Sequence, residues 1–273
     1  NTLFCSAIFL PLILLSQDTR VLDGSIFHVG SGGWEMHRWI LLKSMIVLLS
    51  WVFGYFAIAH LPLTIVGPVN ATRPVMTLVG AMAVFGERLN GWQWAGVVLA
   101  VVSLFLLARS GRKEGIDFSH NKWICFLVLA ALTGTCSGLL DKYLMASPEN
   151  GGVGLDRMMA QSWYNIYQCL MMAAVFIIYK VRRHGSKAAH TPFKWKWSVL
   201  LISLFLSMAD FAYFYSLSMP GAMISIVSMV RRGSVIVSFL CGALLFREKN
   251  LKAKAIDLCF VLLGMICLWI GSY

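Results

Sequence analysis

Long apolar runs separated by short polar connections make up nearly the whole chain. Each run approaches the roughly 20 residues that an α-helix needs to cross a bilayer. Nine such runs cover residues 2–16, 39–59, 61–85, 92–108, 123–140, 158–179, 197–219, 221–246 and 251–271. Backbone amides in hydrocarbon must be satisfied internally, so runs of this length predict helices rather than the short alternating strands of a barrel. The pattern predicts an all-α membrane protein with nine transmembrane helices in this chain.

Composition supports this prediction and excludes other classes. The chain is 59% hydrophobic and 13% charged, whereas a soluble domain carries roughly 25% charged residues. The net charge of +11 arises from Lys and Arg in the connections, which is typical of a polytopic membrane protein and argues against nucleic-acid binding. The seven cysteines lie in apolar runs without a C-x-x-C pair, so we interpret them as packing residues. We expect no cofactor and no bound metal.

A short motif occurs twice. Residues 55–62 read Tyr-Phe-Ala-Ile-Ala-His-Leu-Pro, and residues 213–220 read Tyr-Phe-Tyr-Ser-Leu-Ser-Met-Pro. Each copy precedes an apolar run that carries arginine near its centre and closes on Phe-x-Glu, at 85–87 and at 246–248. The repeat predicts two domains, residues 1–110 with four spans and residues 111–273 with five.

The odd number of helices in a half has a consequence for topology. A five-helix half that follows another such half enters the membrane with inverted orientation, which is the inverted-repeat plan of secondary transporters. The first predicted half has one span fewer, and its first run, 2–16, is short. We therefore expect that this half is truncated at its N-terminus, with one helix missing.

Several of these features resemble the EamA family of the drug/metabolite transporter superfamily. They are the aromatic span that ends in Pro, the next helix closing on Gly86-Glu87 or Arg247-Glu248, and segments 134–145 and 231–248. The resemblance implies a transporter of ten helices in two inverted halves, of which this chain lacks the first. It also implies an integral membrane protein, which we expect in the bacterial inner membrane.

Arginine at mid-membrane is the main candidate chemistry. Arg73 lies twelve residues from both Leu61 and Phe85, and Arg232 lies eleven residues after Gly221. A charged residue at this depth costs at least about 2.5–3.5 kcal/mol and so indicates a function. Guanidinium binds carboxylate and phosphate through two hydrogen bonds, which favours an anionic substrate. The candidate substrate-binding residues of these two helices are Arg73, Asn70, Arg231, Arg232 and Ser228.

A structural alternative stays open for these arginines. They would pair with Asp210 or with helix-end carbonyls and only hold the bundle together. Asp210 itself is either a counter-ion, which we favour, or a proton-coupling group. Asp141 and Lys142, at the predicted end of their helix, would form a gate or, as we favour, mark the membrane interface.

Aromatic residues supply weaker candidates. An aromatic ring in such a helix either stacks on a substrate or, more often, only packs. The polar Gln161 lies near two of these rings and is weaker still, and the Gly134-x-x-x-Gly138 pair favours close helix approach. The stacking candidates are Tyr55, Tyr213, Trp163 and Tyr164.

The favoured function is therefore secondary-active transport, by alternating access, of a small polar and anionic metabolite. A multidrug or amino-acid exporter of the same fold is an alternative. From another class, a membrane enzyme would need paired acid and base residues at one membrane face, and the sequence shows none; a non-transporting scaffold is the second such alternative. The expected partners are a small-molecule substrate and the lipid bilayer, with no nucleic acid, and the protein is a monomer or a homodimer.

Overall fold

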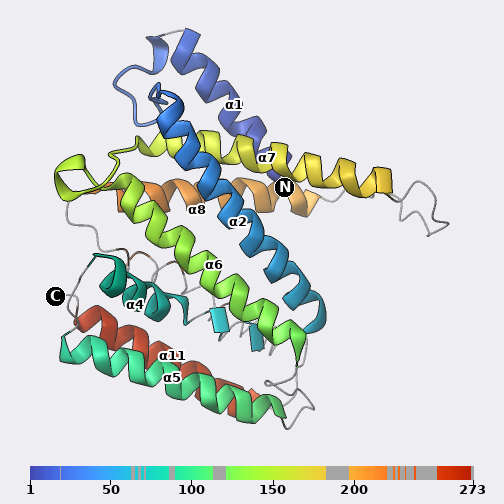
Figure 1. Ribbon diagram of the computed structural model, residues 1–273, viewed down its shortest axis with the longest axis vertical. Helices are drawn as coiled ribbons and strands as arrows, with labels where there is room; N and C mark the ends of the chain where they lie inside the picture. Colours follow the sequence, from blue (N-terminus) through green and yellow to red (C-terminus); the bar gives the residue numbers. More distant parts are fainter. Residues whose placement is uncertain are drawn as a thin grey trace. The chain divides into compact units, whose positions relative to one another are not determined.

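The computed structural model describes most of the chain as helix. Its described residues are 1–18, 20–62, 65–66, 69–70, 72–85, 90–112, 121–182, 197–219, 224, 227, 231, 237 and 251–271. The α-helices in these ranges are α1 (Thr2–Asp18), α2 (Trp34–His60), α4 (Arg73–Phe85), α5 (Gly91–Arg112), α6 (Lys122–Met145), α7 (Arg157–Arg182), α8 (Trp197–Leu217) and α11 (Leu251–Ile270) (Figure 1). Two 3-10 turns, η1 (Arg20–Leu22) and η2 (Pro148–Asn150), precede α2 and α7. The all-α prediction is confirmed for this part of the chain.

The helices carry apolar side chains on their outer faces. Among the described residues, α2, α6 and α8 are long and apolar enough to cross a membrane. Large side chains such as Phe176 and Phe205 are about two-thirds exposed, at 65% and 64%. A water-soluble protein rarely exposes contiguous apolar patches of this kind, whereas lipid tails solvate them. The predicted run 221–246 lies almost entirely outside the described residues.

Two compact units divide the chain. Unit 1 comprises Asn1–Leu48 and Tyr143–Ser218, and unit 2 comprises Leu49–Lys142 and Met219–Tyr273. Each unit takes segments from both halves of the predicted repeat, so the packing units differ from the sequence units. The boundary at residue 110 concerns the repeat and stays a prediction.

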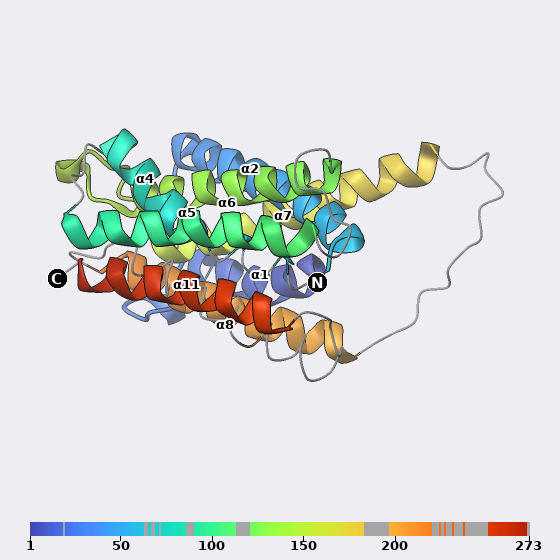
Figure 2. The same ribbon diagram turned by 90° about the horizontal axis from the view of Figure 1, so that it is seen from below.

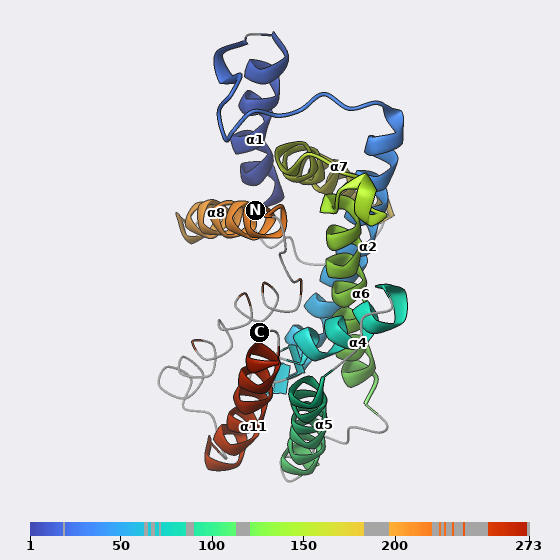
Figure 3. The ribbon, with the colours of Figure 1, turned by 90° about the vertical axis from the view of Figure 1, so that its left-hand side faces the viewer.

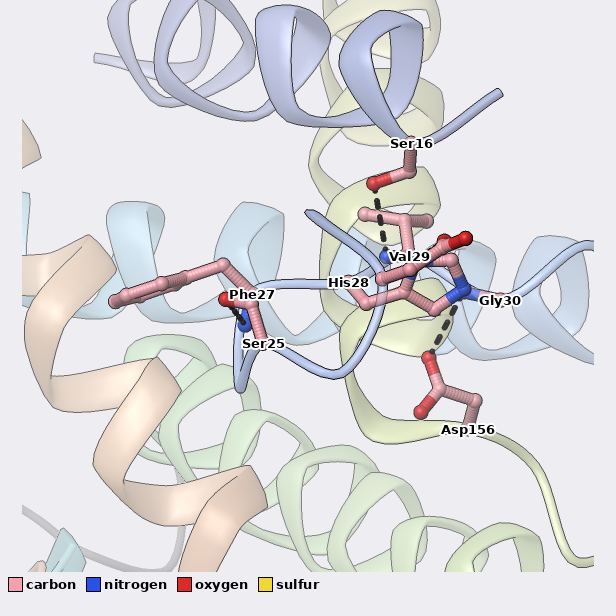
Figure 4. A network of polar contacts seen from close by, with 8 residues as sticks. Ser16, Ser25, Phe27, His28, Val29, Gly30 and Asp156 are labelled. Carbon is pink, nitrogen blue, oxygen red and sulfur yellow. Dashed lines mark hydrogen bonds and ion pairs between the residues drawn. The ribbon is translucent and has the colours of Figure 1, made fainter. Parts of the chain in front are cut away.

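In unit 1, α1 packs against α7 and α8 (Figure 3). The Ser6 hydroxyl donates to the Asn165 carbonyl at 2.9 Å, which joins α1 to α7. The connection before α2 is also fixed to its neighbours (Figure 4): the Val29 amide donates to Ser16 Oγ at 3.1 Å and the Gly30 amide to Asp156 Oδ2 at 3.3 Å.

In unit 2, α5 and α11 run side by side along their lengths (Figures 1 and 2). α5 begins with a reciprocal cap: the Gln93 amide donates to Asn90 Oδ1 at 2.9 Å, and the Asn90 amide donates to Gln93 Oε1 at 3.0 Å. This pair satisfies two amides that a helix start leaves without partners. Asn90 also donates its side-chain amide to the Gly271 carbonyl just after α11.

The predicted helix 61–85 is not continuous, and that prediction was wrong. Thr72 forms a turn, in which its hydroxyl donates to the Val69 carbonyl at 2.7 Å. α4 begins anew at Arg73, followed by Pro74, a residue that fits the first turn of a helix because it has no amide to donate. Arg73 therefore lies at a helix start and not at the centre of one long span.

Candidate functional site

A buried lysine lies inside unit 1, where the sequence predicted none. Lys43 follows Trp34, the first residue of α2, by nine positions, which places it about 14 Å along the helix. Its side chain is 3% exposed. The ammonium lies 4.0 Å from the ring centroid of Phe214 and 5.0 Å from that of Tyr164. The two ring faces stabilise the cation at a depth where an ammonium is otherwise costly.

One face of α7 is polar and buried beside this lysine. Gln161, Tyr164, Asn165 and Gln168 are spaced by three or four residues, so their side chains share a face. All four are buried, and Gln161 and Gln168 almost completely, at 0% and 1% exposure. α7 is therefore amphipathic, with this polar face on one side and strongly apolar side chains on the other.

α8 presents a matching face. Ser203, Ser207, Asp210 and Phe214 recur at helical spacing and are buried, Asp210 at 9% exposure. The Gln161 side-chain amide donates to the Ser207 carbonyl at 3.1 Å. This bond and the position of Phe214 under the Lys43 ammonium bring the faces of α7, α8 and α2 together.

Several polar atoms of these two faces have no hydrogen-bond partner among the described residues. They are Gln161 Oε1, Ser162 Oγ, both amide atoms of Gln168 and Ser207 Oγ. A buried polar group without a partner costs about 1–3 kcal/mol, and folded proteins keep few of them. We call Lys43, Gln161, Ser162, Tyr164, Gln168, Ser207 and Asp210 the polar cluster of unit 1.

Arg73, in unit 2, is hydrogen-bonded to α6. Its Nη2 donates to the Ala130 carbonyl at 2.9 Å, and that oxygen also accepts a bond from the Ser50 hydroxyl at 2.8 Å. Gly134, one turn further along α6, leaves the space that the guanidinium occupies. The structural alternative named Asp210 or helix-end carbonyls as partners, whereas Ala130 lies within α6 and not at its end. The Nε atom of Arg73 is buried without a hydrogen-bond partner in the described structure, and a guanidinium has five donors.

The other predicted site residues are divided between the two units. In unit 1, Gln161, Tyr164, Asp210 and Tyr213 are buried, and Tyr213 lies edge-on to Phe214 at 5.3 Å. Trp163 is half-buried and lies edge-on to His37 at 4.7 Å.

In unit 2, Tyr55 is 72% exposed and Asp141 is 4% exposed, while Asn70 and Lys142 are half-buried. α6 continues to Met145, so Asp141 and Lys142 lie about one turn before its end rather than at it. Arg231 is an exposed helical residue. Arg232 and Ser228 lie outside the described residues.

The sequence analysis missed Lys43 and Gln168. The apolar run begins at residue 39, only four residues before Lys43, whereas the helix begins five residues earlier, in the polar segment Trp34–Arg38. Gln168 lies seven residues after Gln161, and this helical spacing was the signal that could have identified it.

In the described part of the chain, metal-ligating side chains do not cluster around these residues. Within the described ranges, no group of three or more His, Cys, Asp or Glu is arranged to hold a metal ion.

Comparison with known proteins bears on the family. Residues 1–109 match the family model described as "EamA-like transporter family". The match covers less than half of the 273 residues, so it is a similarity of this segment to the EamA family. The match and the apolar helices together point to an integral membrane protein.

The fold likeness extends beyond the EamA segment. One solved crystal structure of another protein matches this chain with a TM-score of 0.61 and 13% sequence identity. The match covers 99% of this chain and 88% of the chain in that structure. In all, 23 chains of solved structures match. At such an identity the likeness concerns the fold alone. A comparison with curated proteins gave no match.

Proposed function

We propose that this protein is a secondary-active carrier for a small polar, anionic metabolite. The observation that carries the proposal is the polar cluster of unit 1, which is buried in helices whose outer faces are apolar. A soluble protein can bury such groups as part of its core, but in a membrane each one is costly and marks a substrate or ion path by default. The EamA-like segment at residues 1–109 agrees with this function.

Alternating access is the proposed mechanism. In inverted-repeat transporters, substrate is bound near the membrane midplane by helices that are broken there. The break at Thr72, directly before Arg73, is a feature of this kind. We infer that residues 1–110 and 111–273 are the two repeats of a nine-helix bundle and that they rock about the bound substrate. The protein would act in the bacterial inner membrane as a monomer or homodimer.

The anionic character of the substrate rests on buried cations. Lys43 is buried in unit 1, and in unit 2 the described structure gives Arg73 one hydrogen bond, to the Ala130 carbonyl, from a guanidinium that has five donors. The remaining donors of a guanidinium suit carboxylate or phosphate. Asp210 in unit 1 and Asp141 in unit 2 are the acidic side chains buried among the described residues, so a site for cationic drugs would depend on these two.

Ligand-induced stabilisation tests the proposal. The purified protein is heated in detergent with each member of a panel of carboxylates, phosphates and lipophilic cations. A ligand that binds the native state at 100 times its Kd stabilises it by about 2.7 kcal/mol, which raises the melting temperature. We expect hits among the anions, and weaker hits in Arg73→Met.

Arg38→Met is the matched control, because Arg38 is exposed and its contacts, with the exposed Glu35 at 3.5 Å and with the neighbouring Trp39 ring at 5.9 Å, lie on the same helix. It should bind the anions as the unaltered protein does. Stabilisation by lipophilic cations alone would overturn the proposal.

A further inference from the structure

We propose that the polar cluster of unit 1 binds hydroxyl groups, so that the transported anion is a polyhydroxylated one such as a sugar acid. This inference rests on the proposed function and extends it from an anionic group to the remainder of the substrate. It is carried by the side chains of α7 and α8 and not by Arg73, which belongs to unit 2.

The buried atoms that have no partner among the described residues include both donors and acceptors. Gln168 brings an amide donor and a carbonyl acceptor, and Gln161 brings a carbonyl acceptor. The hydroxyls of Ser162 and Ser207 can each donate and accept. A carboxylate only accepts hydrogen bonds, so it could pair with only some of these atoms. A hydroxyl both donates and accepts, so adjacent hydroxyls could pair with all of them.

One residue of the cluster, Gln161, is held in place by hydrogen bonds. The bond from Gln161 to the Ser207 carbonyl fixes α7 against α8 at this level. Asn165 lies between the two glutamines on the same face. Its side-chain amide donates to the Gln161 carbonyl at 2.9 Å, so this side chain is bonded to its own helix. Rigid placement of this kind lowers the entropy that binding costs.

Lys43 lies next to this face. Its ammonium contacts the ring of Tyr164, and Gln168 follows Tyr164 by one helical turn. The cluster therefore places a cation beside the amides, as a molecule with an anionic end and a hydroxylated chain requires. Asp210, on the α8 face, can accept further hydroxyl donors.

The test compares three probes that separate the two features. Gluconate carries a carboxylate and a hydroxylated chain, hexanoate carries the same carboxylate and carbon chain without hydroxyls, and sorbitol carries the hydroxyls without the charge. Binding to the full chain in detergent is measured by calorimetric titration. We expect gluconate to bind at least about tenfold more tightly than either hexanoate or sorbitol, since a site with buried polar groups rejects an analogue that leaves them without partners.

Two variants locate the effect. Gln168→Leu keeps a side chain of similar size without the amide, and Ser207→Ala removes one hydroxyl. Each should raise the Kd of gluconate about tenfold and leave that of hexanoate unchanged. Ser44→Ala is the matched control, because the fully buried Ser44 hydroxyl already donates to the Ile40 carbonyl of its own helix at 2.8 Å. It should change neither value.

The possible results separate this inference from the proposed function. Equal affinity for gluconate and hexanoate would overturn the inference and leave the anion carrier standing, as would unchanged gluconate binding in both Gln168→Leu and Ser207→Ala. Binding of sorbitol alone would support the hydroxyl site and overturn the anionic substrate. If none of the three probes binds, the inference fails, and the broader anion panel decides the proposed function. Ser207→Ala removes only one atom, so it remains informative even if Gln168→Leu does not fold.

Discussion

Gly134 on α6 provides the sharpest test of how Arg73 is held. A Cβ placed on Gly134 would lie 2.6 Å from Arg73 Nη1 and 2.8 Å from Cζ, both well inside van der Waals contact. In Gly134→Ala the guanidinium must therefore move. Moving it breaks the 2.9 Å bond from Nη2 to the Ala130 carbonyl.

The expected magnitude follows from two opposing terms. Losing a hydrogen bond to a charged group costs about 1.5–3 kcal/mol. Replacing Gly by Ala within a helix stabilises by about 0.5–1 kcal/mol. Gly134→Ala should therefore lower the free energy of unfolding by about 0.5–2.5 kcal/mol. In an Arg73→Met background the steric conflict is largely relieved, so the same substitution should be neutral or stabilising.

The assay is reversible unfolding in mixed micelles, read by circular dichroism, for the two single variants and the double variant. The cycle should give a coupling energy of about 1.5–3 kcal/mol. Gly54→Ala is the matched control, since its Cβ would meet Ala130 Cβ at an ordinary 3.8 Å, and it should stabilise the protein. Additive effects of Arg73→Met and Gly134→Ala would refute the placement of Arg73 against α6.

Two further predictions concern contacts outside the candidate site. His60 stacks on Trp123 with ring centroids 3.5 Å apart and an interplanar angle of 7°. His60→Ala should destabilise the protein by about 0.5–1.5 kcal/mol and alter the near-ultraviolet dichroism of the tryptophan. An unchanged spectrum would contradict the stacking. Asp156 Oδ2 accepts from the Met159 amide at 2.8 Å and from Gly30 (Figure 4). Asp156→Ala should therefore cost about 1 kcal/mol and speed proteolysis within residues 20–33, whereas Asp18→Ala, an exposed acid at the end of α1, should do neither.

Much of the helical content followed from hydropathy alone. The predicted runs 92–108, 123–140 and 197–219 correspond to α5, α6 and α8, with ends that differ by at most five residues. Apolar runs indicate where a chain can cross a membrane because hydrocarbon forces helix formation. They do not show where a helix extends into polar residues, as α2 does back to Trp34. The apolar run alone therefore places Lys43 closer to a helix end than it lies in α2.

The break before Arg73 was not predicted, because an apolar run has the same composition whether the helix within it is continuous or interrupted. Pro74 was the available signal, since proline favours a helix start. The partner of Arg73 could not have been found in this way, because the Ala130 oxygen is a backbone atom and every residue has one. Its role depends on Gly134 leaving room for the guanidinium. Packing of that kind follows from tertiary structure and not from spacing along one helix.

Transport itself is tested most directly by counterflow in proteoliposomes. Liposomes that contain the purified protein are loaded with unlabelled gluconate and diluted into a trace of radiolabelled gluconate. A carrier should accumulate label transiently above its equilibrium level, and Arg73→Met should slow this accumulation while Arg38→Met should not. Label that only equilibrates, at the rate of protein-free liposomes, for gluconate and for every anion that stabilises the protein, would contradict the carrier function.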